Sequence, residues 1–136
     1  MTTITARPTA SLLRRALLLD GVASGGLGVL LTVAASPLTG VFGGPAALHR
    51  TVGIFLIVYG AAVLYLGTRP AISRPAAATV VVLNCGWVLA SAAVAIADPW
   101  SLAALGIAFV VAQALVVAGL AALQFAGLRQ FHGVSR

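Results

Sequence analysis

The sequence predicts an all-α integral membrane protein, a four-helix bundle whose helices run up, down, up and down with both chain ends in the cytoplasm. Three observations lead to this prediction. The 136 residues are 61% hydrophobic and only 7% charged, at a mean hydropathy of +1.12, whereas about a quarter of the residues of a soluble domain are charged. Four apolar segments are long enough to cross a membrane. Seven of the eight arginines flank those segments on one side.

The apolar segments cover residues 12–35, 46–67, 75–97 and 100–126. A helix rises about 1.5 Å per residue, so about 20 apolar residues cross the ~30 Å hydrocarbon core of a bilayer. The connections between segments are short, so we expect consecutive helices to be antiparallel neighbours in one transmembrane domain that spans residues 1–136. The tails and connections leave no room for a separate soluble catalytic domain.

Proline and glycine mark the ends of the predicted helices. Proline suits the first turn of a helix, where its missing N–H costs nothing. The segment from Leu38 to Phe42, between the first and second helices, should lie in the outer membrane interface. The boundaries fall at Ser36-Pro37, Gly43-Gly44-Pro45, Arg69-Pro70 and Arg74-Pro75.

The motif Asp98-Pro99-Trp100 precedes the fourth segment. Asp98 can accept backbone N–H bonds as an N-cap, and Pro99 fits the first helical position. Trp100 has the amphipathic ring that anchors helices at a membrane interface. We therefore interpret Asp98 as the cap of the fourth helix rather than as an ion ligand.

The arginines give the orientation, because positive residues accumulate on the cytoplasmic side of a membrane. The opposite side carries only Arg50, with His49 and Asp98. Arginines at helix ends also attract anionic lipid headgroups, at about 1 kcal/mol each, so the positive charge requires no nucleic-acid partner. The absence of lysine is typical of a GC-rich bacterial genome, and we expect a multi-pass protein of the bacterial cytoplasmic (inner) membrane. The cytoplasmic arginines are Arg7, Arg14, Arg15, Arg69, Arg74, Arg129 and Arg136.

Small residues indicate where the helices meet, because in lipid the close approach of backbones replaces the hydrophobic effect as the source of packing energy. The second segment repeats glycine every seven residues, at Gly53, Gly60 and Gly67, a period suited to a left-handed helix crossing. The first segment carries Gly21 and Gly25 at a four-residue spacing. These two glycines could face a helix of the same chain or a second copy of it.

Each predicted helix places one polar side chain at a similar depth in the membrane: Asp20, Tyr59, Asn84 and Gln113. Ser24 lies one turn beyond Asp20, and Trp87 lies one turn beyond Asn84. Intramembrane acids usually face a bundle interior, a partner or water, so this polar layer predicts an internal pocket or a proton-coupled site. Two other interpretations remain open. The layer could be a hydrogen-bond network that only fixes packing, or Asp20 could extend toward Arg14 or Arg15.

Other chemistry-bearing residues are few. His49 and His132 are predicted at opposite ends of the bundle, so they cannot together hold a haem or metal in one monomer. Cys85 is a single cysteine, which we expect to be buried, and it gives no disulfide or zinc pattern. We therefore predict no cofactor and no metal. His49 and Arg50 could contact an anionic headgroup or a quinone carbonyl at the outer surface, although interface anchoring also explains them.

Two family resemblances follow from this layout. Four short helices with Asp20 in the first are similar to small multidrug-resistance transporters, in which an essential intramembrane glutamate would correspond to Asp20. The sequence Leu17-Leu18-Leu19-Asp20-Gly21-Val22-Ala23 departs from their pattern. The whole chain looks more like the DoxX-like small four-helix bacterial membrane proteins, on the basis of Pro37, Gly43-Gly44-Pro45 and Arg50-Thr51-Val52-Gly53. That resemblance implies membership of a redox or quinone-linked membrane assembly, with no cofactor in the protein itself.

These observations favour a non-enzymatic role, as a binding protein or as an accessory or scaffold subunit of a membrane assembly. The alternative is a proton-coupled small-molecule transporter that acts as a homo-oligomer. Expected partners are the lipid bilayer, a lipid, quinone or small apolar ligand, and either further copies of the chain or a larger membrane complex.

Overall fold

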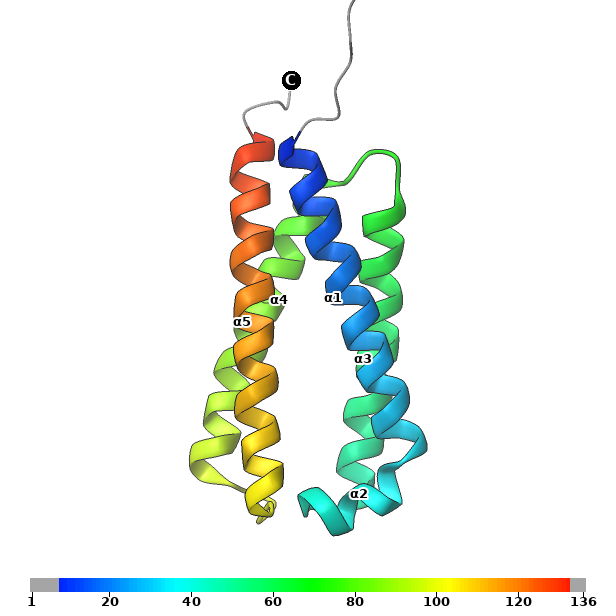
Figure 1. The fold of residues 1–136 in the computed structure, drawn as a ribbon, viewed down its shortest axis with the longest axis vertical. Helices are drawn as coiled ribbons and strands as arrows, with labels where there is room; N and C mark the ends of the chain where they lie inside the picture. Colours follow the sequence, from blue (N-terminus) through cyan, green and yellow to red (C-terminus); the bar gives the residue numbers. More distant parts are fainter. Residues whose placement is uncertain (1–7, 133–136) are drawn as a thin grey trace, which may run out of the picture.

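The computed structural model describes residues 8–132, which form five helices (Figure 1). Arg7 and Arg136 therefore lie outside the described residues. Four of the helices are long and apolar enough to cross a membrane, as the sequence predicts. The bounds are α1 Pro8–Val33, α2 Ala35–Phe42, α3 Ala46–Thr68, α4 Arg74–Ala97 and α5 Ala104–His132.

The first two long helices, α1 and α3, pack directly on each other through glycine. A Cβ atom added to Gly60 would lie 2.6 Å from the backbone nitrogen of Gly25 and 2.8 Å from the carbonyl oxygen of Gly21. One added to Gly53 would meet the backbone of α1 at Gly28. The heptad glycines of α3 thus face α1 of the same chain, and a residue larger than glycine at these positions would push the two helices apart.

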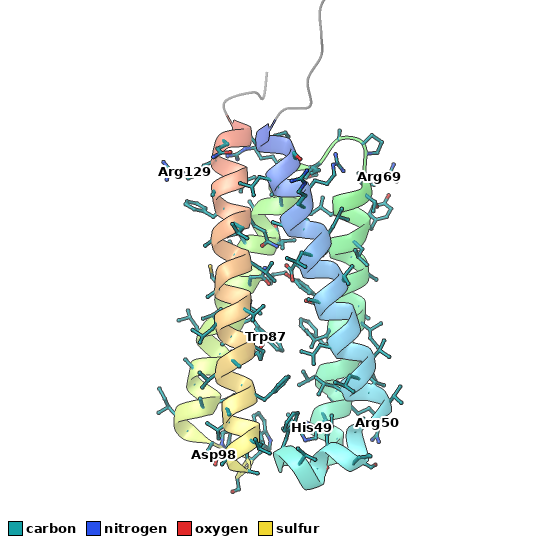
Figure 2. All side chains as sticks on the ribbon, viewed as in Figure 1. His49, Arg50, Arg69, Trp87, Asp98 and Arg129 are labelled. Atoms are coloured by element: carbon teal, nitrogen blue, oxygen red, sulfur yellow. The ribbon has the colours of Figure 1, made fainter. Side chains whose placement is uncertain are left out.

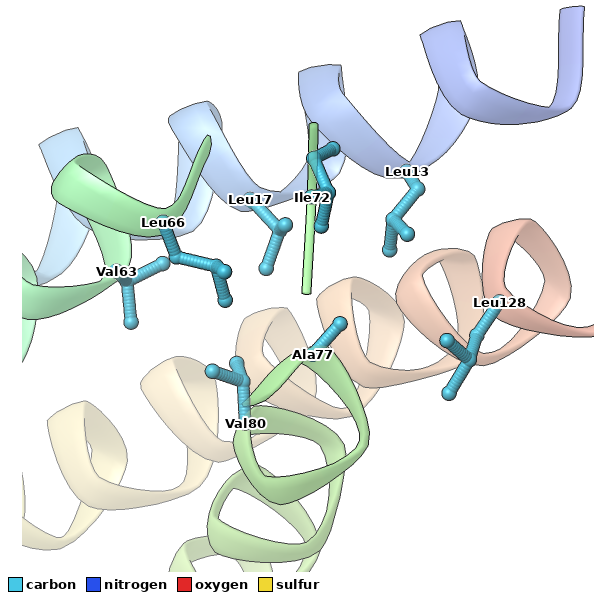
Figure 3. Packing of buried hydrophobic residues seen from close by; sticks show 8 residues of the cluster. All are labelled: Leu13, Leu17, Val63, Leu66, Ile72, Ala77, Val80 and Leu128. Atoms are coloured by element: carbon cyan, nitrogen blue, oxygen red, sulfur yellow. The ribbon is translucent and has the colours of Figure 1, made fainter. Parts of the chain in front are cut away.

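The other two long helices, α4 and α5, form a second pair, which meets the first mainly where α5 packs on α1. The contact between the two pairs is tightest near the start of α1 and the end of α5, where a cluster of buried side chains fills the interior (Figure 3). Contrary to the expectation that consecutive helices are close neighbours, the backbones of α3 and α4 approach each other at few points, and only side chains link them. The cluster consists of Leu13, Leu17, Val63, Leu66, Ile72, Ala77, Val80 and Leu128.

Arg14 on α1 forms hydrogen bonds with the end of α3. Its guanidinium donates hydrogen bonds to the carbonyl oxygens of Gly67 at 2.6 Å, Arg69 at 2.7 Å and Pro70 at 3.1 Å. The last carbonyls of a helix lack partners within it, and a cation there also interacts favourably with the helix dipole. Arg14 therefore holds the α3–α4 connection, and Arg15 is exposed. Asp20 is bonded by neutral side chains, contrary to the interpretation that it extends toward Arg14 or Arg15.

At the opposite end, the short helix α2 lies across the base of the molecule (Figure 1). The sequence did not predict this helix. Pro37 occupies its first turn, where proline is compatible with a helix. The Phe42 ring stacks on that of Phe109 at 4.9 Å, and the carbonyl oxygen of Phe42 accepts a 2.8 Å hydrogen bond from the nitrogen of Ala103. The connection between α1 and α3 is thereby tied to the start of α5.

The turn between α4 and α5 differs from the prediction. Asp98 is the C-cap of α4 in the left-handed conformation, with φ 46°, and is not the N-cap of the fourth long helix. Its Oδ1 atom accepts a 2.7 Å hydrogen bond from the nitrogen of Leu102, before α5 begins at Ala104. Pro99 and Trp100 belong to the turn and not to the helix. The carboxylate of Asp98 therefore stabilises the turn itself.

Candidate functional site

A polar network centred on Asp20 joins all four long helices. The side chain of Asp20 is almost fully buried, with 1% of its surface exposed. Its Oδ2 atom accepts hydrogen bonds from Asn84 on α4 at 2.9 Å and from Gln124 on α5 at 2.8 Å. Its Oδ1 atom accepts a 3.1 Å bond from the hydroxyl of Ser24, one turn further along α1. Every donor is an uncharged side chain.

The neighbours of Asp20 are also bonded to one another. The Asn84 amide nitrogen donates its second hydrogen bond to Oε1 of Gln124 at 2.9 Å, and its Oδ1 atom accepts a 2.7 Å bond from the hydroxyl of Tyr59 on α3. Tyr59 has a single hydroxyl proton, which it donates to Asn84 at this shorter distance. Oδ2 of Asp20, 3.4 Å from the same hydroxyl, is the alternative acceptor. Asn84 thus uses both amide protons and its oxygen, which fixes its orientation in the bundle.

Of the residues expected in one layer, the structure brings Asp20, Ser24, Tyr59 and Asn84 together and separates Gln113 from them. Gln113 belongs to a second network, where its Oε1 accepts a 2.8 Å bond from the indole nitrogen of Trp87 and its Nε2 donates to Ser91 at 2.9 Å.

The place expected for Gln113 is taken by Gln124, eleven residues or about 16 Å further along α5. The sequence prediction measured depth from the middle of residues 100–126. Because α5 covers Ala104–His132 and Asp20 lies nearer the end of the bundle where α5 finishes, the residue level with Asp20 is Gln124. The sequence did offer a signal for Gln124, because it is a polar residue within the apolar segment 100–126.

A cavity of about 540 Å³ lies directly beside the Asp20 network. Asp20 is the one charged residue among those that line it, and hydrocarbon and aromatic side chains make up most of the remaining wall. Phe55 on α3 and Leu83 on α4 also line the cavity, and about half of each side chain is exposed to the surroundings of the protein. The cavity is partly open, and these exposed lining residues belong to α3 and α4, whose backbones approach each other at few points.

A second cavity of about 250 Å³ continues toward α2. Phe42, His49 and Trp100 line its far end. Figure 2 shows Trp87 midway along the molecule and His49 near its base. The two cavities share five lining residues and therefore adjoin each other between the helix pairs; together they are called the cleft. The shared residues are Leu27, Leu56, Trp87, Ala90 and Gln113.

The other residues singled out by the sequence lie elsewhere. His49, expected at the outer surface, is 7% exposed, and its Nε2 lies 2.8 Å from the carbonyl oxygen of Gly43. Because a carbonyl can only accept, this nitrogen carries the proton and donates. Arg50 is exposed. Cys85, expected to be buried, is exposed on α4. Within the described part of the chain, no cluster of three or more His, Cys, Asp or Glu side chains could hold a metal ion.

Comparison with models of protein families, with curated proteins and with solved structures finds no match for this chain. The class of this protein therefore follows from its fold and its site alone. The chain is a helical protein with four apolar helices long enough to cross a membrane. A cleft between two pairs of these helices has a carboxylate in its wall.

Proposed function

We propose that this protein spans the membrane and binds a small membrane-soluble molecule in the cleft between its helix pairs. One observation carries the proposal: a cavity of about 540 Å³ with apolar walls has Asp20 and its network on one side. Ligand sites are usually apolar pockets with a few well-placed polar groups. A network that only fixes helix packing does not require an apolar cavity beside it.

The opening between α3 and α4 supports binding from within the membrane. In a bilayer, this side of the molecule would face lipid, so a molecule dissolved in the hydrocarbon region could enter without passing through water. Trp87 is held by its hydrogen bond to Gln113, which gives the cavity a rigid aromatic wall. A preformed wall of this kind reduces the entropy lost on binding.

The proposed orientation places the packed end of the bundle in the cytoplasm. Arg69 and Arg129 lie at that end, whereas Arg50 and Asp98 lie at the other (Figure 2). Arg14, Arg15 and Arg74 belong to the same end as Arg69 through their positions on α1 and α4. The positive-inside rule supports this orientation, and a bacterial inner membrane is the proposed location.

A second candidate function is proton-coupled transport of the bound molecule by a homo-oligomer. The observation that favours it is the position of Asp20, an ionisable group in the wall of the cavity and at the centre of the bundle. In liposomes, such a transporter would move protons when substrate is added. Asp20→Asn would abolish that proton movement.

Photolabelling tests the binding proposal. The probes are alkyl chains that carry a diazirine and end in either a hydroxyl or a trimethylammonium group. We expect saturable labelling of cleft residues such as Leu56 and Val117 by at least one probe, mapped by mass spectrometry. Leu89 and Ile96 are exposed and line neither cavity, so they report labelling from bulk lipid. Labelling of these two residues alone, with both probes, would refute the proposal.

A further inference from the structure

We infer that the molecule in the cleft is a single-chain amphiphile with a positively charged nitrogen. Its head pairs with Asp20, and its tail lies along the cleft toward α2. This inference rests on the proposed function and adds the chemical class and the orientation of the ligand.

The first argument concerns the hydrogen-bond partners of the Asp20 carboxyl group. The three side chains that donate hydrogen bonds to it, Ser24, Asn84 and Gln124, are all neutral, as is the more distant Tyr59. Its neighbours therefore orient it as an acceptor without supplying a positive charge. An unpaired carboxylate is costly in an apolar surrounding, and a cation compensates it. Of the two arginines nearest in sequence, Arg14 is bound to three carbonyl oxygens at the end of α3, and Arg15 is exposed. The cavity beside Asp20 is therefore the space from which a counter-charge can come.

One carboxylate oxygen, Oδ1, accepts fewer hydrogen bonds than the other. Oδ2 receives the bonds from Asn84 and Gln124, both of which are buried. Oδ1 receives one longer bond, from the hydroxyl of Ser24, and Ser24 itself lines the cavity and is partly exposed. Because the Asp20 side chain is only 1% exposed, a ligand head must displace the Ser24 hydroxyl from Oδ1 to contact it. That displacement leaves intact the bonds to Asn84 and Gln124 that join the helices.

The aromatic residues of the cavity supply the second argument. The ring of Phe55 is nearly parallel to those of Tyr59 and Trp87, at centroid distances of 6.1 Å and 5.8 Å. All three line the same cavity as Asp20. A cation within about 6 Å of an aromatic face is attracted by the ring, and the attraction grows when water is excluded. A carboxylate beside aromatic faces favours a cation over a neutral or anionic head.

The shape of the cleft gives the orientation of the tail. Asp20 lies on one side of the larger cavity, and the smaller cavity continues to His49 and Phe42. Tyr59 and His49 are ten residues apart on α3, a separation of about 15 Å along the helix. The walls between them are mainly hydrocarbon and aromatic. This space suits one alkyl chain, and a two-chain phospholipid is too large for it.

The test compares two probes of equal chain length, decyltrimethylammonium and decanol, with the full-length protein in non-ionic detergent micelles. Trp87 fluorescence reports binding in a Trp100→Phe background, because Trp87 lines both cavities. The key variant is Asp20→Asn. Its amide oxygen can keep the bonds from Asn84 and Gln124, and its amide nitrogen can donate to Ser24, so the fold should be retained. The control is Asp98→Asn, which changes the other acidic residue of the chain, in the α4–α5 turn.

We expect Asp20→Asn to weaken binding of decyltrimethylammonium by about tenfold to one-hundredfold, the effect of losing the attraction between one cation and one carboxylate in a largely apolar site. Binding of decanol should not change, and Asp98→Asn should change neither. If Asp20→Asn weakens both probes equally or neither probe, the inference is wrong while the proposed function stands. If neither probe binds the parent protein, the proposed function fails as well. Competition by phosphatidylethanolamine at equal concentration would show that the occupant is a membrane lipid, and this would also overturn the inference.

Discussion

Asn84 donates a 2.9 Å hydrogen bond to Oδ2 of Asp20, a residue 64 positions earlier in the chain. Asn84 is 4% exposed and also bonds Tyr59 and Gln124. One amide side chain therefore links α4 to each of the other three long helices. The network and the cleft share this residue, so the stability of the bundle and the geometry of the proposed site depend on each other.

Replacing Asn84 with alanine should destabilise the fold. Three interhelical hydrogen bonds would be lost, each contributing about 0.6 kcal/mol in a membrane bundle, for a total of about 2 kcal/mol. Cys85→Ala is the matched control, because Cys85 is the next residue on the same helix and is exposed. The free energy of unfolding in mixed micelles measures both. Equal stability of the two variants would show that the network contributes little.

The contact between α1 and α3 gives a paired glycine prediction. Gly60→Ala would place a Cβ atom 2.6 Å from the Gly25 nitrogen, whereas a Cβ atom at Gly25 meets nothing within 4 Å. We expect Gly60→Ala to cost about 1–3 kcal/mol, as overpacking does, and Gly25→Ala to be close to neutral. Thermal unfolding monitored by circular dichroism distinguishes them. A neutral Gly60→Ala would mean that the two helices do not pack this closely.

Arg14 and Arg15 form a second matched pair. Arg14→Met removes three hydrogen bonds to the carbonyls that end α3, whereas Arg15 is exposed. Both changes remove one positive charge from the same end of the protein. We expect Arg14→Met to lower the free energy of unfolding by about 1–2 kcal/mol and Arg15→Met to leave it nearly unchanged. Hydrogen bonds from a charged group are strong, but solvent partly screens them here. Faster exchange of the backbone amide hydrogens of residues 66–69 should accompany the loss. Equal exchange in the two variants would contradict the role given to Arg14.

The parts of this structure that were predictable from the sequence have simple physical causes. Each long helix needs about 20 apolar residues, so the four segments stand out by composition. Asp20, Tyr59 and Asn84 were found because a polar side chain within such a segment requires a partner. The heptad of glycines on α3 indicated a close contact, but the identity of its partner helix, α1, depends on helix rotation.

The parts that were missed depend on tertiary contacts. Gln124 was overlooked because the depth of a residue depends on where its helix begins, and the turn at Asp98 delays α5 to Ala104. Helix α2 was missed because Ser36-Pro37 resembles a break, although Pro37 is compatible with a first turn. The cleft follows from the sparse contact between α3 and α4, which no local pattern reveals.

Cysteine labelling tests the proposed orientation. In a Cys85→Ser background, Ser36→Cys places a thiol on α2, and Ala71→Cys places one in the connection between α3 and α4; both positions are exposed. With the protein expressed in a bacterium, a membrane-impermeant maleimide should label Ser36→Cys in intact spheroplasts. It should label Ala71→Cys only after lysis. The reverse pattern would invert the orientation, and labelling of both in intact spheroplasts would contradict the membrane crossing of α3.

The proposed tail position predicts a dependence on chain length. Ala90 lines both cavities, and a bulky side chain there can close the junction between them. We expect Ala90→Phe to weaken binding of decyltrimethylammonium by about tenfold or more, because several buried methylene groups would be displaced. Butyltrimethylammonium, whose chain stays in the larger cavity, should bind as before. Ala93→Phe is the control, since Ala93 is exposed on the same helix and lines neither cavity. If Ala90→Phe weakened both cations equally, the tail would not extend into the smaller cavity, and pairing of the head with Asp20 would be the part of the inference that remains.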